Sequence, residues 1–320
     1  MKKIQISRQQ IKKIKQLQSF LQNYWGKDHI FVKNKNFLIW QHKNRSFLTY
    51  VIAKLLNKIV GVMGYIPQSH YDSKLSKNEI FLTISRVIEN ISPAIHLKIF
   101  RFVQKNLAKK FIGSLGGWNA RVANYNKYLG FTTGFMDHYL VTSPYLEKYK
   151  IINFKKKLIT PINKYNNCEF HEINEKFFRK KKFHNLFRHQ YPKKSNIFII
   201  NRYLKHPIYK YNVFLLKKYS KPLAIIIIRK VKIGKASALR IVDFIGKQNE
   251  FSNIGNLIIY LFKKYKSEFI DIYSHGINVK YMERTGFVNR RKINNLIVPD
   301  YYEPFVRKNI NLMYGYICKY

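Results

Sequence analysis

The chain has 320 residues, enough for two domains, and 46% of them are hydrophobic and 16% aromatic. This composition excludes a disordered chain. There are 60 Lys and Arg residues against 16 Asp and Glu, a formal net charge of +44, which predicts attraction to nucleic acid, anionic lipid or phosphorylated substrates. The abundance of Lys, Asn, Ile, Tyr and Phe is also typical of an AT-rich genome, so charge alone selects no partner.

The cysteine and hydropathy patterns favour a protein of the reducing cytoplasm. Cys168 and Cys318 lie far apart and belong to no CxxC motif, so neither a disulfide framework nor a zinc site is predicted. The N-terminal stretch has scattered basic residues instead of a charged start and an apolar core, which argues against a signal peptide. The longest apolar run, residues 223–228, is too short to span a bilayer.

The first half of the chain reads as a helix, a hairpin, and then alternating strands and helices. Apolar spacing predicts a helix over about residues 7–24. The remaining elements of this half are a hairpin of strands 47–54 and 59–66, strands 79–88, 111–117 and 135–143, and helices beginning near Ile95 and Asn119.

The second half repeats this order. It has a hairpin over residues 211–231, a strand at 238–246, a helix at 254–265, a strand at 268–276 and a short helix before Phe287. The helix-glycine-aromatic ending of the first half also recurs, with Tyr125, Gly130 and Phe131 matched by Tyr281, Gly286 and Phe287. A duplicated unit explains this pattern. We therefore expect an α/β fold of two domains. The first spans residues 1–152, and the second, residues 153–320, consists of a linker helix region followed by a degenerate copy of the first unit.

This order of elements resembles the GNAT acyltransferases, in which a mixed central sheet is flanked by helices. The stretches "WGKDHIFVKNKNFLIWQ", "IVGVMGYIPQSHYD", "YLGFTTGFMDHYLV", "NRYLKHPIYKY", "RIVDFIG" and "VPDYYEPFVRKNI" look like those of tandem-GNAT proteins found with bacterial surface-polysaccharide genes. The resemblance covers nearly the whole chain. At the level of the fold it extends to the Fem-type aminoacyl transferases.

The resemblance implies that acyl-coenzyme A, most simply acetyl-coenzyme A, binds where two strands diverge in the first domain. These would be strands 80–87 and 111–115, with the pyrophosphate at the following helix N-terminus. The residues implied are Arg86, Val87, Ser92, Ala94, Ile95 and Asn119. The family's Q/RxxGxG/A signature is absent here, and Ser92 before Pro93 is also a simple helix cap. The stretch "GKQNEFSNIGNL" stands at the equivalent place in the second half.

The same resemblance implies roles for polar residues elsewhere. Tyr125 lies near the position of the tyrosine that protonates the leaving thiolate, and His29 is a candidate base, although a structural role suits a histidine among aromatics equally well. Trp40 and Gln41 are candidate substrate contacts. In the stretch "NRYLKHPIYKY", the candidates for binding a sugar or phosphate are Arg202, His206 and Tyr209, and a domain-joining role remains the alternative.

The function expected from these features is an acyl-coenzyme A-dependent N-acyltransferase. Its acceptor would be an amino sugar, possibly nucleotide-linked, in surface-polysaccharide synthesis, and the amine would attack the thioester directly. One alternative is a Fem-like transferase that uses aminoacyl-tRNA. Another is a GNAT-fold protein without catalysis that binds nucleic acid or an anionic glycan. The sequence specifies no oligomeric state.

Overall fold

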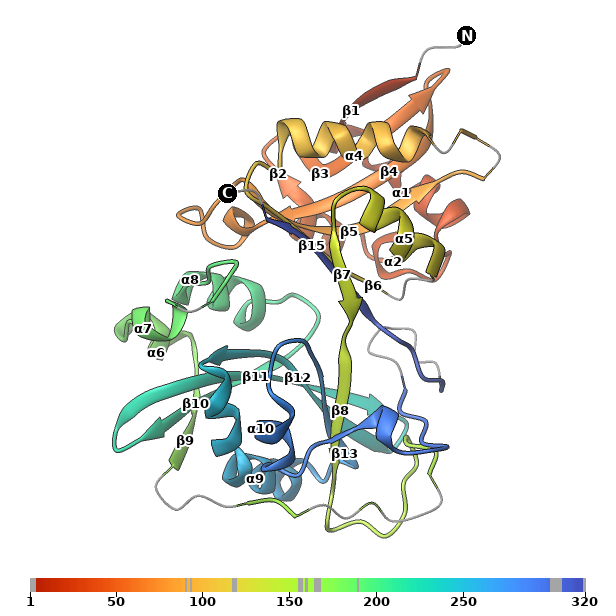
Figure 1. Cartoon of the computed structure of the whole chain (residues 1–320). Coiled ribbons are helices and arrows are strands. Elements are labelled where there is room, and N and C mark those ends of the chain that lie inside the picture. Colours follow the sequence, from red (N-terminus) through yellow and green to blue (C-terminus); the bar gives the residue numbers. More distant parts are fainter. Residues whose placement is uncertain are drawn as a thin grey trace. The chain divides into compact units, whose positions relative to one another are not determined.

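The computed structural model describes residues 4–89, 91–92, 94–116, 120–154, 158, 161–163, 168–188, 190–299 and 307–318 (Figure 1). The chain forms two compact units, Met1–Gly134 with Met313–Tyr320, and Phe135–Leu312. The expected boundary at residue 153 is therefore corrected. The reason is that residues 135–152 pack with the second unit, whereas the C-terminal strand pairs with the first.

The first unit is built on a mixed sheet. Its strands lie in the order β1 (Gln5–Gln10), β3 (Phe47–Leu55), β4 (Lys58–Pro67), β5 (Glu79–Val87), β6 (Phe111–Gly116), β15 (Met313–Cys318) and β7 (Thr132–Phe135), and the short β2 (Lys43–Asn44) also pairs with β3. The predicted helix over residues 7–24 is wrong at its start. There β1 pairs with β3, placing Ile6 opposite Ala53, and the helix begins only at Ile14.

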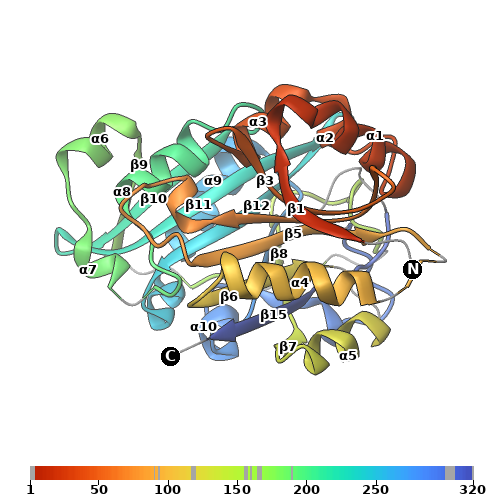
Figure 2. The same ribbon diagram turned by 90° about the horizontal axis from the view of Figure 1, so that it is seen from above.

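Helices cover both faces of this first sheet (Figure 2). On one face lie α1 (Ile14–Tyr24), α2 (Ile30–Lys33) and α3 (Lys35–His42), and on the other lie α4 (Ala94–Asn106) and α5 (Ala120–Tyr128). Strand alternation supplies both cores, because Tyr50 and Ile52 face α1–α3 whereas Val51 and Ala53 face α4. No helix of the described residues combines the length and apolar character needed to cross a bilayer.

The second unit has a sheet of the same plan. The order is β9 (Cys168–Ile173), β10 (Tyr211–Lys218), β11 (Lys221–Ile233), β12 (Ala236–Gly246), β13 (Phe269–Ser274), β8 (Asp137–Thr142) and β14 (Val288–Asn289). The apolar run of β11 is buried on both faces, as expected for a central strand. One face packs on α9 (Gly255–Tyr265) and α10 (Val279–Glu283). The other carries α6 (Glu175–Lys180), α7 (His184–Phe187) and α8 (Asn196–Ile199) (Figure 1).

The two sheets match strand for strand, but each takes its sixth strand from the other half of the sequence. In the first sheet β15 pairs antiparallel with β6, and in the second β8 pairs antiparallel with β13. The strand expected over residues 135–143 is β8, which begins at Asp137, two residues after β7 ends, and completes the second sheet, not the first. The α/β fold of two mixed, helix-flanked sheets is confirmed, with one strand exchanged in each direction.

Each sheet opens between a pair of parallel strands, β5 and β6 in the first unit and β12 and β13 in the second. The ladder between β5 and β6 runs only from Glu79 opposite Phe111 to Phe81 opposite Gly113. The ladder between β12 and β13 contains only Leu239 opposite Ile270 and Arg240 opposite Asp271. In both units the strand that enters the divergence also carries a register shift, in β5 against β4 and in β12 against β11. Such bulges bend a strand and re-aim its side chains.

Candidate functional site

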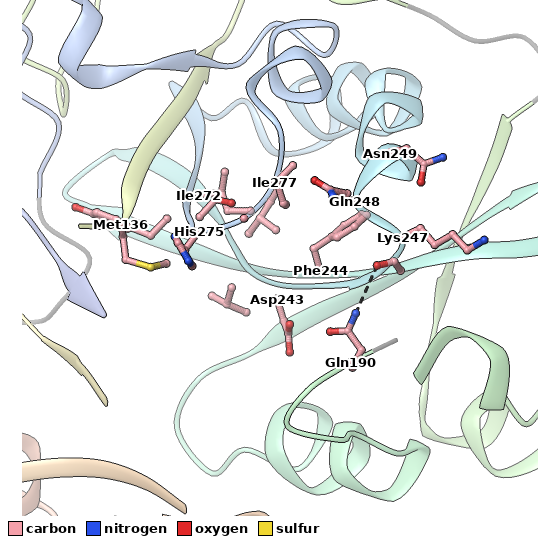
Figure 3. A pocket seen from close by; sticks show the side chains of 16 residues that line it. Met136, Gln190, Asp243, Phe244, Lys247, Gln248, Asn249, Ile272, His275 and Ile277 are labelled. Carbon is pink, nitrogen blue, oxygen red and sulfur yellow. Dashed lines mark hydrogen bonds between the residues drawn. The ribbon is translucent and has the colours of Figure 1, made fainter. Parts of the chain in front are cut away.

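A cavity of about 700 Å³ lies in the second unit where β12 and β13 diverge (Figure 3). Its wall is formed by the C-terminal half of β12 with the loop that follows, by the end of β13 with its loop, and by Met136 and Gln190. The lining residues are Met136, Gln190, Ile241–Phe244, Gly246–Asn249 and Ile272–Ile277. The sequence analysis placed the divergent strands of interest in the first unit, so the position of this cavity was not predicted.

The two strands face the cavity with backbone edges that do not pair with each other. The outer edge of β12 is taken by β11, with Ile226 opposite Phe244. The outer edge of β13 is taken by β8, with His138 opposite Tyr273. Beyond Arg240 and Asp271 the inner edges separate. A ligand with amide groups can therefore bind between them as an additional strand would.

Asp243 supplies a largely covered carboxylate to the cavity wall. It follows the bulge of β12, and its side chain is 11% exposed. Both carboxylate oxygens contact Lys194 Nζ at 2.6 Å, and the Tyr203 hydroxyl donates to Oδ2 at 2.8 Å. Figure 3 shows Asp243 beside Gln190, whose Nε2 donates to Gly246 O at 3.4 Å. The residues 190–203 thus supply the polar groups that face the bulge.

Tyr203 donates to Asp243 from a π-helical turn, Ile200–Leu204. Such turns occur frequently at functional sites. Burial raises the pKa of Tyr203 well above its usual range, and the negative charge of Asp243 acts in the same direction. The hydroxyl therefore stays protonated and remains a donor.

A second buried polar cluster lies at the point where β12 and β13 separate. His138 Nε2 contacts Asp271 Oδ2 at 3.0 Å, and Arg240 Nε lies 3.5 Å from Oδ1. The His138 ring stacks on Tyr273, a cavity residue, with 4.0 Å between centroids. Burial lowers the pKa of His138, an effect that Asp271 opposes and that the charges of Arg290 and Arg240 reinforce. A neutral imidazole therefore holds Tyr273 in the wall.

The loop between β12 and α9 contains the stretch that is equivalent to the pyrophosphate loop expected in the first unit. It folds as a 3-10 helix, Gln248–Asn253, whose Glu250 carboxylate accepts from the side chains of Asn249 and Asn253. A Cβ at Gly255, the first residue of α9, would lie 1.9 Å from Asn163 O. The glycine is thus required by a close backbone approach within the protein. The backbone at Asn163 therefore covers the N-terminus of α9.

Replacing Gly255 with Ala is expected to destabilise the second unit by about 1–3 kcal/mol, because the new methyl group displaces the backbone at Asn163. Urea unfolding monitored by circular dichroism measures the change. Gly26→Ala is the matched control, since a Cβ there meets nothing within 4 Å. Equal stability of the two variants would contradict the role assigned to Gly255.

In the first unit, the residues expected to hold the pyrophosphate are engaged with one another. Ser92 caps α4 as predicted: its Oγ accepts from Ala94 N–H at 3.3 Å, and its carbonyl accepts from Ile95 N–H at 3.0 Å. Arg86 is paired with Glu89 at 2.8 Å, which places a negative charge at the start of the loop. Val87 is half-buried and packs into the core beneath α4. An anion here would have to displace these contacts.

Tyr125 lies on α5 against His96 of α4, with 5.2 Å between ring centroids. His96 Nε2 in turn contacts Ser85 Oγ of β5 at 2.7 Å. Burial, and secondly Tyr128, raise the pKa of Tyr125, whereas the charge of Arg101 lowers it. Tyr125 is therefore protonated, as a general acid must be. Asn119 lies outside the described residues.

The other first-unit candidates have structural contacts. His29 caps α2, because its Nδ1 accepts from Phe31 N–H at 3.2 Å, and burial lowers its pKa. The Trp40 ring stacks on Phe37, with 5.7 Å between ring centroids. The backbone carbonyl of Trp40 contacts His70 Nε2 at 3.0 Å. Gln41 is half-buried on α3. These residues do not come together with Tyr125 in any described contact.

The candidates in the stretch 202–209 flank Tyr203 but do not line the cavity. The guanidinium of Arg202 lies over the Tyr203 ring at 5.6 Å. His206 Nδ1 accepts from Tyr209 N–H at 3.0 Å, and Arg229 lies over the Tyr209 ring at 4.5 Å. Burial lowers the pKa of His206 to about 4, and the charges of Arg202 and Arg229 act with it. This stretch anchors the π-helical turn to β10 and β11.

The sequence analysis missed Asp243, Lys194 and Tyr203. One signal was available, because Asp243 is the only acid within the apolar strand "RIVDFIG". Its partners lie 40 and 49 residues away, which no local pattern reveals. Among the described residues, no group of three His, Cys, Asp or Glu side chains is placed to hold a metal ion.

Comparison with known proteins defines the class of fold. The structure is similar to a GCN5-related N-acetyltransferase from Anabaena variabilis (10% identity, TM-score 0.58, 98% of this chain and 72% of that one). It is also similar to Saccharomyces cerevisiae N-myristoyltransferase with bound myristoyl-CoA (9% identity, TM-score 0.51, 98% and 78%) and to a putative acetyltransferase from Pyrococcus horikoshii (10%, 0.50, 99% and 90%). No family model and no curated protein matches the sequence.

At this level of identity the likeness concerns the fold alone. The chain thus has a GNAT-like fold of two units, and the sheet of each unit opens between two parallel strands. More particularly, it is a tandem arrangement in which the sixth strand of each sheet is exchanged.

Proposed function

We propose that this protein is an acyltransferase that binds an acyl-pantetheine thioester in the second unit. The observation that carries the proposal is the cavity between β12 and β13, with its two facing backbone edges. Structures of the same fold include one with bound myristoyl-CoA, which supports an acyl-coenzyme A as the ligand class. The local sequence motifs favoured the first unit, but there the corresponding loop amides of Ala94 and Ile95 already have partners.

The residues around the cavity fit such a ligand. The amides of a pantetheine arm would pair with the backbone of residues 242–246 and 272–274, as a strand pairs with its neighbours. Ile241 and Ile272 form the apolar end of the cleft and exclude water from it. When bound, the thioester supplies the electrophilic acyl carbon. Asp243 then provides the negative charge that attracts and orients an ammonium group in the acceptor.

The acceptor that we propose is the amine of an amino sugar, possibly nucleotide-linked, with acetyl-coenzyme A as the donor. Supporting features are the carboxylate of Asp243 at the cavity and the sequence resemblance to polysaccharide-linked proteins. The net charge of +44 favours a second candidate, in which aminoacyl-tRNA is the donor. Under that alternative, binding of tRNA would fall steeply with increasing salt.

A cleft-blocking variant tests the proposal. His275 is an exposed residue of the cavity mouth, so His275→Trp places a bulky ring across it. Calorimetric titration with acetyl-coenzyme A is expected to show binding to the wild type and at least about tenfold weaker binding to the variant, a loss of about 1.4 kcal/mol. Release of free thiol with amino-sugar nucleotides measures the transfer itself.

The matched control is Leu115→Trp. Leu115 is an exposed residue of β6, beyond the paired part of the divergent strands in the first unit. This variant is expected to bind acetyl-coenzyme A as the wild type does. Weaker binding by Leu115→Trp alone would move the site to the first unit. The absence of binding to the wild type at millimolar concentrations would refute the function.

A further inference from the structure

The Lys194 side chain places a primary amine against the carboxylate that faces the cavity. We infer that Lys194 Nζ is an internal acyl acceptor, so that the protein acylates itself at this lysine. This inference rests on the proposed function, since it requires a thioester in the cleft between β12 and β13. It goes further because it names a modification site in the protein.

Three geometric features support the inference. First, Lys194 Nζ lies 2.6 Å from both oxygens of Asp243, a residue of the cavity wall. Second, the Lys194 side chain is only 19% exposed, so its amine is held on the protein instead of moving freely in solvent. Third, the same segment lines the cavity through Gln190, which contacts Gly246 O across it. The amine is therefore held close to the proposed thioester site.

Lys194 differs in this respect from other amines nearby. Lys193 precedes it in the chain and is exposed. Lys247 lines the mouth of the cavity and is also exposed. Transfer requires an amine that can give up a proton to a base and is restricted in position, and a fixed geometry accelerates such reactions strongly. Lys194 meets both requirements through Asp243.

The chemical step balances without another reactant. Nζ gives one proton to the Asp243 carboxylate, and its lone pair attacks the carbonyl carbon of the thioester. The C–N bond forms, the C–S bond breaks, and the thiolate leaves with the electron pair of that bond. The nitrogen then loses a second proton to the thiolate, and the proton on Asp243 passes to solvent water, which restores the carboxylate. The product is an uncharged amide at Lys194 and a free pantetheine thiol.

Acylation would change the electrostatics of the site. The amide has no charge, so Asp243 would lose its ion pair and keep the hydroxyl of Tyr203 as a donor. A buried carboxylate without a cation attracts an ammonium group from elsewhere. Self-acylation would therefore open the Asp243 position to the amine of an external acceptor.

The test uses the full chain and acetyl-coenzyme A. Mass spectrometry of peptides sampled over time gives the acetylated fraction at Lys194, Lys193 and Lys247. Lys194 is expected to react at least about tenfold faster than Lys193, the adjacent exposed lysine, because only Lys194 has a base and a fixed position. This comparison is made within the wild-type protein and does not depend on any variant folding.

Two variants extend the test. Asp243→Asn keeps the side-chain shape but removes the base, and is expected to lower the rate at Lys194 to that of Lys193. Lys194→Arg keeps the cation and should abolish the rapid phase. Urea unfolding shows whether each variant is folded.

Calorimetric titration with coenzyme A distinguishes a failure of self-acylation from a failure of the proposed function. If coenzyme A binds and Lys194 reacts no faster than Lys193, self-acylation is overturned and the proposed function stands. If coenzyme A does not bind, both fail together.

Discussion

Truncation of the chain after Leu312 is expected to unfold the first unit and to leave the second unit folded. The deleted residues form β15, which lies between β6 and β7 in the first sheet. Residues 313–318 pair with residues 111–116, so the deletion removes the whole antiparallel ladder of β6 and leaves β7 without its neighbour. The loss is expected to exceed the roughly 5–15 kcal/mol that keeps a domain folded.

Limited proteolysis followed by mass spectrometry measures this effect. Peptides of residues 4–134 should be released rapidly, whereas residues 135–312 should resist digestion. Tyr316→Thr is the control, because Tyr316 is 36% exposed and Thr suits a strand, so the change is expected to stay within about 1 kcal/mol. Resistance of both units after truncation would show that β15 is dispensable for the first sheet.

Replacing His42 with Gln is expected to remove most of the acid sensitivity of the first unit. His42 is fully buried on α3, with its Nδ1 at 2.8 Å from Thr49 Oγ1. Burial lowers the pKa of His42 to about 3, and the charge of His70 acts with it, whereas the backbone of Thr49 and Tyr65 opposes the shift. The folded unit therefore contains His42 as a neutral imidazole.

The sign of the effect follows from proton binding. In the unfolded chain His42 binds a proton below about pH 6.5, but in the folded unit it does so only near pH 3. Its contribution to stability is present above about pH 6.5 and is lost as the pH falls toward 3. The total loss is about 4–5 kcal/mol, as an upper estimate. A glutamine side chain does not titrate. The unfolding free energy of the first unit in the His42→Gln variant should therefore vary less with pH than that of the wild type.

Urea unfolding at a series of pH values between 7 and 3 provides the measurement. His171→Gln is the matched control, because the His171 side chain is 51% exposed and lies on the edge strand β9 of the other unit. This control should keep the pH dependence of the wild type. If His42→Gln also keeps it, another group is responsible for acid sensitivity in the first unit.

The order of strands and helices was predictable because the local patterns are strong. The apolar run of β3, which is buried on both faces, indicates a strand, and the apolar stripe of α9 indicates a helix and its buried face. The recurring Gly130–Phe131 and Gly286–Phe287 pairs reveal the duplication, and both glycines have positive φ, at 89° and 80°. A residue that ends a helix in this conformation is favoured to be glycine.

Pairing between distant segments was not predictable. Residues 5–10 carry no signal that separates a strand from the first turn of a helix, and the decision comes from the free edge of β3. The pattern of β8 suits a central strand of either sheet, so its exchange could not be inferred. The Asp243 site could not be predicted for the same reason, because it forms only when residues 190–203 pack against β12.

Strand exchange also affects the order in which the molecule is completed on the ribosome. The edge of β6 becomes available early in translation, but its partner β15 is made only after all of residues 135–312. Nascent domains usually fold as they emerge, and uncovered edges of this kind promote aggregation. The first sheet therefore remains incomplete while the second unit is synthesised. During this time chaperones would have to shield the exposed edge of β6.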